Sequence, residues 1–105
     1  MITYRFFRHY VDMVEGSVNA AVMLSFAMDK QVNLRMDEGL GGFGYWKFTQ
    51  DDWFKATGLS RRELETCRAI LKRTEFWHEK LMGLPAVLRY RVDLDALSDA
   101  EKEVK

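Results

Sequence analysis

The sequence predicts a small α+β domain, mainly α, in which a three-helix core is closed by a C-terminal β-hairpin and preceded by an extra N-terminal helix. Three observations predict it: an apolar run over residues 18–28, two helix-capping signals on either side of residue 58, and a period-two pattern over residues 86–94. The chain has 105 residues and is 48% hydrophobic, which suits one domain with its own core. We expect this domain to occupy residues 1–97 and residues 98–105 to form a charged tail.

The N-terminal third is expected to hold two helices. The first presents an apolar stripe at helical spacing, formed by Phe7, Tyr10, Val11 and Val14. Gly16 can end this helix, and Ser17 is a suitable N-cap for a second one over residues 17–35. Because the second helix is apolar nearly all round, it should be the buried, central helix. The stripe would cover the domain's own core or contribute to a two-fold interface, and we favour its own core with some contribution to a dimer.

Residues 37–44 favour a loop. They read Asp-Glu-Gly-Leu-Gly-Gly-Phe-Gly, and clustered glycines interrupt helices and strands. A phosphate-binding glycine loop is the functional alternative. It would need a preceding strand and a Gly-Lys-Ser/Thr triplet, and the sequence shows neither. We interpret residues 39–44 as a surface connection whose role the sequence leaves open.

Two helices separated by a tight turn are predicted next. Thr49 is the expected N-cap of the first, and Gly58 is its expected end. Ser60 and Glu63 then form the capping box of a second helix that should run to about Arg73. The buried side of that second helix should consist of Leu64, Cys67, Ile70 and Leu71.

Strands are predicted around these helices. Residues 45–48 alternate in a way that suits a short strand, and residues 76–82 and 86–94 suit two longer ones. In the last strand, apolar residues occupy every second position from Ala86 to Leu94, which is typical of a half-buried strand. Because the two longer strands are separated only by a Gly-Leu-Pro tip, they should form a hairpin over residues 76–94.

The stretch from Trp46 to Leu97 resembles the winged-helix domains of phage and plasmid replication or regulatory proteins. The matching residues are Trp53 in the first helix, Thr-Gly-Leu-Ser-Arg-Arg at 57–62 and Asp-Leu-Asp-Ala-Leu at 93–97. The resemblance implies a winged helix-turn-helix, with residues 49–73 as the helix-turn-helix and 76–94 as the wing. It also implies double-stranded DNA as the default ligand and a role in transcription regulation or DNA replication.

A helical wheel supports a DNA-reading face on the helix after Ser60. The residues opposite the buried stripe and their flanks are Arg61, Arg62, Glu65, Thr66, Arg68, Ala69, Lys72 and Arg73. Small side chains at the centre would let the helix enter a major groove, while Arg62 could reach a guanine and basic flanks could hold phosphates. Glu65 would accept from a cytosine or hold a neighbouring arginine in place. The wing adds candidate backbone contacts at Lys80, Arg89 and Arg91.

The distribution of charge along the chain gives modest support to a DNA-reading face on this helix. Residues 59–94 carry a net charge of +3, whereas residues 1–58 carry −1 and residues 95–105 carry −2. The whole chain is neutral, with a pI near 6.7, and dedicated DNA-binding domains are usually more basic. Neutrality and the acidic tail therefore favour a second interpretation, a winged-helix protein-interaction module that does not bind DNA.

The sequence offers no set of side chains typical of an enzyme. Cys67 lies on the buried stripe, where a packed thiol is expected rather than a nucleophile. Asp51 and Asp52 fit the first turn of a helix, where negative charge is favourable. His9 and His78 have no neighbours at metal-ligand spacing. We therefore expect no catalysis, no cofactor and no bound metal.

The chain is expected to act in the cytoplasm without a membrane partner. Residues 1–10 lack the apolar run of a signal peptide, and residues 18–28 fall short of the roughly 20 residues that a membrane-spanning helix needs. A homodimer is left open, because most readers of this type bind DNA as dimers.

Overall fold

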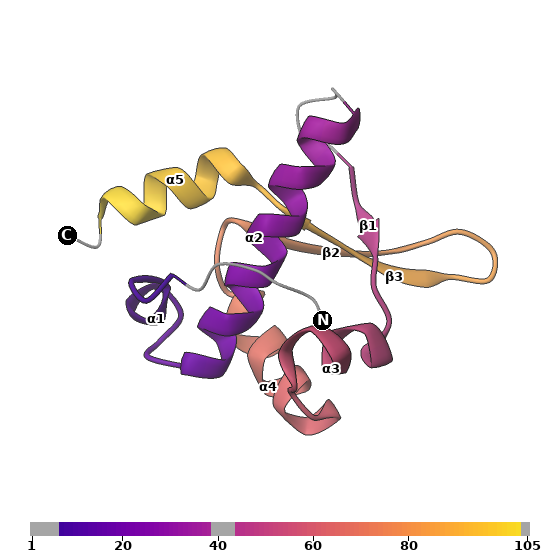
Figure 1. Ribbon diagram of the computed structural model, residues 1–105, viewed down its shortest axis with the longest axis horizontal. Coiled ribbons are helices and arrows are strands. Elements are labelled where there is room, and N and C mark those ends of the chain that lie inside the picture. Colours follow the sequence, from indigo (N-terminus) through magenta and orange to yellow (C-terminus); the bar gives the residue numbers. More distant parts are fainter. Residues whose placement is uncertain (1–6, 39–43, 104–105) are drawn as a thin grey trace.

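The computed structural model describes residues 7–38 and 44–103. It shows an α+β domain in which helices dominate, as the sequence predicts (Figure 1). In chain order the elements are α1 (Tyr10–Met13), α2 (Val18–Glu38), β1 (Trp46–Lys47), α3 (Gln50–Thr57), α4 (Arg61–Leu71), β2 (Trp77–Met82), β3 (Val87–Val92) and α5 (Leu94–Lys102). The three helices α2, α3 and α4 pack against one another, and α2 also packs against β3.

The central helix is α2, as its apolar sequence predicts. The Ser17 hydroxyl accepts a hydrogen bond from the amide of Ala20 at 3.1 Å, which confirms the predicted N-cap. Met23 and Leu24 are fully buried in the middle of the helix. The C-terminal end differs from the prediction, because α2 continues through Glu38 and includes two residues expected in the loop. The rest of that loop, residues 39–43, lies outside the described residues.

Both predicted caps around the tight turn are confirmed as capping boxes. Before α3, the Thr49 hydroxyl accepts from the Asp52 amide at 3.0 Å, and the Asp52 carboxylate accepts from the Thr49 amide at 2.9 Å. Before α4, Ser60 and Glu63 make the same pair of bonds at 3.2 and 2.9 Å. Gly58 ends α3 with φ of 77°, a left-handed conformation that costs glycine little. Helix α4 ends at Leu71, two residues earlier than expected.

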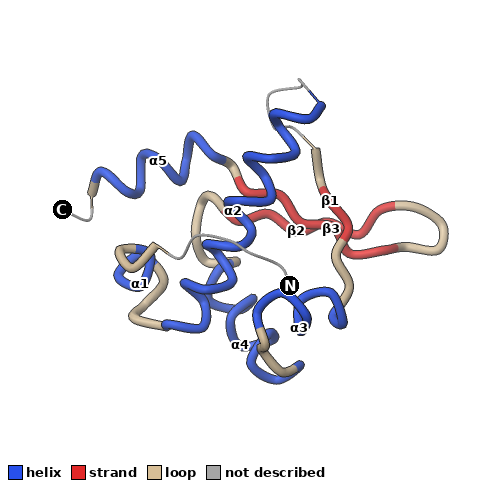
Figure 2. The backbone as a smooth tube through the Cα atoms, in the orientation of Figure 1, coloured by secondary structure: helices blue, strands red, loops and turns tan. Residues whose placement is uncertain are grey.

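The strands form one antiparallel sheet in the order β1-β3-β2 (Figure 2). The period-two pattern of β3 is confirmed, since Tyr90 and Val92 are buried whereas Arg89 and Arg91 are only partly covered. Tyr90 pairs with Trp46 of β1 and with Glu79 of β2, and directly paired residues share a face of the sheet. This face therefore turns toward the helices. The predicted first strand is shorter than expected, because β1 contains only two residues.

An aromatic cluster fills the space between the sheet and the helices. Trp53 of α3 is 1% exposed and packs against Phe26, Trp46, Phe48, Trp77 and Tyr90, with ring centroids 5.0–6.4 Å apart. Rings at such separations and tilted angles pack favourably beyond the area they bury. The tryptophans are thus core residues.

A buried glutamine joins α2 to the sheet, and no pattern in the sequence indicates this contact. The Gln31 side-chain oxygen accepts from the indole N–H of Trp46 at 2.7 Å and from the amide of Val92 at 3.0 Å. Its side-chain nitrogen donates to the carbonyl of Gly44 at 3.1 Å. Gln31 is 0% exposed, and its bonds to Trp46 and Val92 satisfy polar groups buried from water, whereas the Gly44 carbonyl is only partly buried.

The two ends of the described chain pack together. Tyr10 and Val14 of the N-terminal stripe are buried, so this stripe covers the domain's own core, as favoured above. Asp93 caps α5 by accepting from two backbone amides, and Leu97 is 2% exposed. The expected boundary between domain and tail at residue 97 therefore falls inside a helix. The imidazole of His9 lies 2.8 Å from the Glu101 carboxylate, which links the region of α1 to α5.

The capping boxes make the stability of the protein sensitive to acid. Hydrogen bonds from the backbone amides of Thr49 and Ser60 lower the pKa values of Asp52 and Glu63 below their ordinary 3.8 and 4.5. A carboxylate with a lowered pKa in the folded state stabilises the fold above its unfolded pKa, and this contribution is lost as the pH falls through the lowered value.

We therefore expect the free energy of unfolding to decline as the pH drops below about 4.5. In Glu63→Gln the amide oxygen can still accept from Ser60, but it carries no titrating charge, so the decline should be shallower. Urea titrations followed by circular dichroism measure the free energy of unfolding of both proteins between about pH 2.5 and pH 7, a range that brackets the titration of carboxylates. Identical pH profiles for the two proteins would contradict the assignment.

Candidate nucleic-acid interface

Helix α4 presents the face that the helical wheel predicts. Leu64, Cys67 and Leu71 are between 0% and 4% exposed and pack into the core. The opposite side of the helix is open to solvent along its length and carries Arg62, Glu65, Thr66 and Ala69. Local sequence sets this orientation, because the capping box fixes where the helix begins and the apolar spacing fixes which side turns inward.

Two of the predicted contact residues are held in exposed ion pairs. Arg61 lies 3.4 Å from Glu65 one turn along the same helix. Arg73, just after α4, binds the Glu15 carboxylate with two hydrogen bonds of 2.8 Å. The hydrogen bond from Arg73 lowers the pKa of Glu15. Exposed pairs of this kind contribute little to stability, so both arginines remain available for exchange to a phosphate.

Arg68 differs from the sequence expectation of an exposed phosphate contact. Its side chain is 29% exposed and turns toward the sheet, where it binds Glu79 with three hydrogen bonds of 2.6–3.1 Å. Glu79 is 6% exposed and also accepts from the indole N–H of Trp77 at 2.8 Å. The pair therefore joins α4 to β2, and the charge of Arg68 is neutralised at close range.

Arg62 and Lys72 are the basic side chains on or next to α4 whose charge is not paired with a described carboxylate. Both are exposed, and neither forms an ion pair with any residue in the part of the chain that the structure describes. The Thr66 hydroxyl donates to the Arg62 carbonyl at 3.1 Å. Because α4 begins at Arg61, the unpaired guanidinium of Arg62 stands in the first turn of the helix. A groove-binding helix usually makes its base contacts there.

The outer face of the sheet carries a basic row that includes a residue missed by sequence reasoning. Lys47 of β1 and Lys80 of β2 both pair with Arg89 of β3, so the three side chains lie side by side on the face turned away from the core. Arg91 follows on the same face, opposite His78. Only strand register places Lys47 beside the hairpin, which is why its position in the sequence gives no such signal.

Among the side chains that the structure describes, those of residues 7–33 and 44–103, this basic row has no acidic partner. None of its three members, nor Arg91, belongs to an ion pair there. Like charges placed directly opposite each other in a sheet repel. A polyanion laid across this face would relieve that repulsion.

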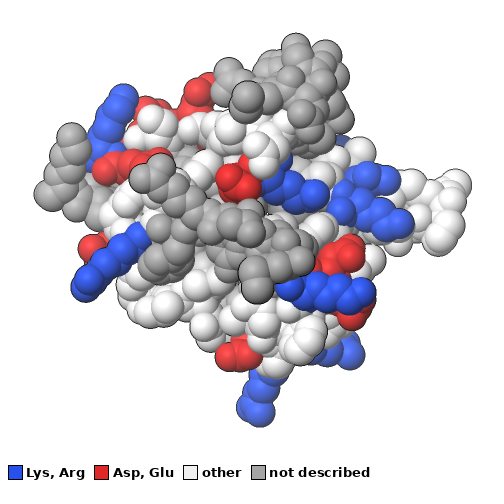
Figure 3. Space-filling model, viewed as in Figure 1, with Lys and Arg blue, Asp and Glu red and all other residues white. Residues whose placement is uncertain are grey.

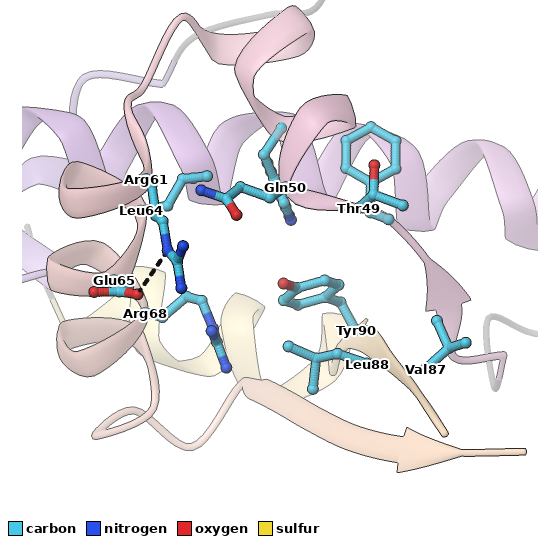
Figure 4. A pocket seen from close by; sticks show the side chains of 11 residues that line it. Thr49, Gln50, Arg61, Leu64, Glu65, Arg68, Val87, Leu88 and Tyr90 are labelled. Carbon is cyan, nitrogen blue, oxygen red and sulfur yellow. Dashed lines mark hydrogen bonds and ion pairs between the residues drawn. The ribbon is translucent and has the colours of Figure 1, made fainter. Parts of the chain in front are cut away.

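A cleft of about 280 Å³ separates α4 from the hairpin (Figure 4). Arg61 and Glu65 of α4 line one side, and Leu88 and Tyr90 of β3 line the other. Burial raises the pKa of the Tyr90 hydroxyl, so this group stays protonated at the base of the cleft. Because helix and hairpin border one hollow, a single elongated ligand can contact both.

Other chemistry finds little support in the described part of the chain. Burial raises the pKa of the Cys67 thiol to about 11, which keeps it protonated and unreactive at neutral pH. Among the described residues, no three His, Cys, Asp or Glu side chains cluster as metal ligands. The described helices include none that is both long and apolar enough to span a membrane.

Comparison with known proteins adds no family to these observations. No family model matches the chain, and the searches of curated proteins and of solved structures return no match.

Proposed function

We propose that this chain is a winged helix-turn-helix protein that binds double-stranded DNA. The observation that carries the proposal is the exposed face of α4, where an unpaired Arg62 precedes the small side chains of Thr66 and Ala69. A helix that is narrow at its centre and positively charged at its N-terminal end suits a major groove. The order of elements, a helix-turn-helix followed directly by a β-hairpin, supports the same proposal.

In this proposal the helix reads bases and its surroundings bind phosphates. Arg62 would donate to a guanine, while Thr66 and Arg73 would face the groove. Backbone contacts would come from Arg61 and Lys72, and from the hairpin residues Lys80, Arg89 and Arg91. Arg68 acts instead as a positioning residue, because its bond to Glu79 fixes α4 relative to the hairpin. The protein would serve transcription regulation or replication initiation in the cytoplasm, for a mobile element or its host.

A protein-interaction module is the second candidate. It is favoured by the ion pairs of Arg61, Arg68 and Arg73 with acidic side chains, and by the zero net charge of the chain. Such a surface is less positive than its sequence suggests. The two candidates differ in one measurable property, since affinity built on phosphate contacts must fall with salt.

The expected result is duplex binding whose affinity falls steeply with ionic strength. After selection of a preferred sequence from a random DNA pool, Arg62→Ala should weaken binding by about 1–3 kcal/mol and relax the preference at one base position, as loss of a base contact does. Fluorescence anisotropy across a salt series, with matched and substituted duplexes, measures both effects. Glu65→Gln in the same assay shows whether Glu65 contributes to base preference or only to affinity.

A matched pair of lysine variants controls this experiment. Lys72→Ala should lower affinity for all sequences alike and reduce the salt slope by about one. Lys102→Ala removes another exposed lysine, in α5, which lies away from α4 in Figure 1, and should leave the slope unchanged. If the wild-type protein shows no salt-sensitive binding to any duplex at low ionic strength, the DNA proposal fails and the interaction module takes its place.

A further inference from the structure

The end of the hairpin is an exposed apolar tip. Residues 81–88 read Leu-Met-Gly-Leu-Pro-Ala-Val-Leu, eight residues without a charge in a chain that is 30% charged. Leu84 is fully exposed and Leu81 is 66% exposed. In Figure 1 this end of the hairpin projects away from the helices, and in Figure 3 it appears as an uncharged lobe. Large apolar side chains concentrated on a projection usually mark a contact with another molecule.

Both faces of the hairpin are apolar beyond the basic row. Leu81 pairs with Leu88 on the inner face, and Met82 pairs with Val87 on the outer face. A solvated two-stranded ribbon would be expected to carry polar side chains on at least its outer face. Leu88 packs partly against the core, but packing within the domain does not explain Leu81 and Leu84, which are 66% and fully exposed.

The apolar tip and the basic row are spaced to suit the minor groove of DNA. Lys80 and Arg89 form a directly opposed pair behind the tip, and Gly83 lies three positions after Lys80 along the chain. At about 3.3 Å per residue the tip lies roughly 10 Å beyond the row. The minor groove is about 7.5 Å deep. When the tip reaches the floor of the groove, the basic side chains therefore stand at the level of the phosphates.

We propose that the hairpin tip is a wedge that inserts Leu84 into the minor groove and bends the DNA. Leucine, methionine and proline are the kinds of side chain that proteins insert between base steps, where they unstack the bases and kink the duplex. Leu84 enters the groove first, and Pro85 stiffens the tip. The basic row of Lys47, Arg89 and Lys80 neutralises the phosphates that the bend brings together. This inference rests on the proposed DNA binding and adds a bending activity to it.

Charge favours DNA as the occupant over another copy of this chain. A second copy would bring its own basic row close to the first, and the described residues place no carboxylate in the row to offset this. A phosphodiester backbone supplies negative charge on both sides of the groove, which matches an apolar tip flanked by cations.

The experiment measures bending separately from binding. A mixed-sequence duplex of about 100 base pairs is shorter than the persistence length of DNA, so ligase closes it into a circle slowly unless a protein bends it. The full chain should raise the rate of circle formation about tenfold. Leu84→Ser should lose most of that increase while its affinity, measured by anisotropy on the same duplex, falls less than about fivefold. Val18→Ser removes another exposed apolar side chain, 58% exposed at the start of α2, and should behave as wild type.

The outcomes separate the wedge from the proposed function. Salt-sensitive binding without faster circle formation, or equal circle formation by wild type and Leu84→Ser, overturns the wedge and leaves DNA binding intact. Absence of duplex binding overturns both. Sedimentation of the free proteins tests the rival occupant: a wild-type dimer that Leu84→Ser converts to a monomer would make the tip a self-association contact and overturn the proposal.

Discussion

Replacing Gln31 with leucine is expected to destabilise the fold by about 3–5 kcal/mol, because two buried N–H groups and one partly buried carbonyl lose their partner at once. Those groups are the indole N–H of Trp46, the backbone N–H of Val92 and the carbonyl of Gly44. Leucine fills a similar volume, so the loss would come from unsatisfied hydrogen bonds rather than from a cavity. Urea unfolding followed by tryptophan fluorescence measures the change in the free energy of unfolding.

Asn33→Leu provides the matched control for this experiment. Asn33 lies two residues further along α2, is exposed, and makes only a 3.4 Å contact with Asp29 one turn earlier. Its replacement should change stability by less than about 0.5 kcal/mol, as is usual for surface positions. A loss below 1 kcal/mol in Gln31→Leu would show that water reaches these groups and that the glutamine does not join α2 to the sheet.

Gln31 also shows where sequence interpretation of this chain ends. The caps at Thr49 and Ser60 were predictable, because a capping box depends on residues three positions apart. The buried side of α4 was predictable for the same reason, since helical periodicity is local. A glutamine near the end of an apolar run has no such signature. Its role depends on β1 and β3, which the chain brings to it only after folding.

In the candidate interface too, local features were predictable from the sequence and long-range contacts were not. The exposed positions of Arg62, Thr66 and Ala69 follow from the helical wheel and are found in the structure. The partners of the arginines do not follow from it. Glu15 reaches Arg73 across 58 positions of sequence, and long-range ion pairs have no periodic signal. The basic row requires knowledge of strand register, and the buried position of Leu97 requires knowledge of how α5 packs on the rest of the domain.

Replacing Arg68 with alanine is the second large effect expected. The change would leave Glu79, which is 6% exposed, with the indole of Trp77 as its remaining partner and without its cation. Removing one member of a buried ion pair leaves the other charge buried without a partner. Because Arg68 is partly exposed, we expect the free energy of unfolding to fall by about 2–3 kcal/mol, near the low end for such pairs. Thermal and urea unfolding of the variant measure it.

A double variant distinguishes a positioning role of Arg68 from direct phosphate binding. In Arg68→Met with Glu79→Leu both charges are replaced by apolar groups, which often restores or raises the stability of a buried site. If Arg68 only positions α4 against the hairpin, this double variant should recover most of the lost stability and keep the wild-type salt slope for duplex binding. If Arg68 leaves Glu79 to bind a phosphate, the slope should fall by about one even in the stable double variant. The bond to Glu79 would then be a resting state of the interface, broken when DNA binds.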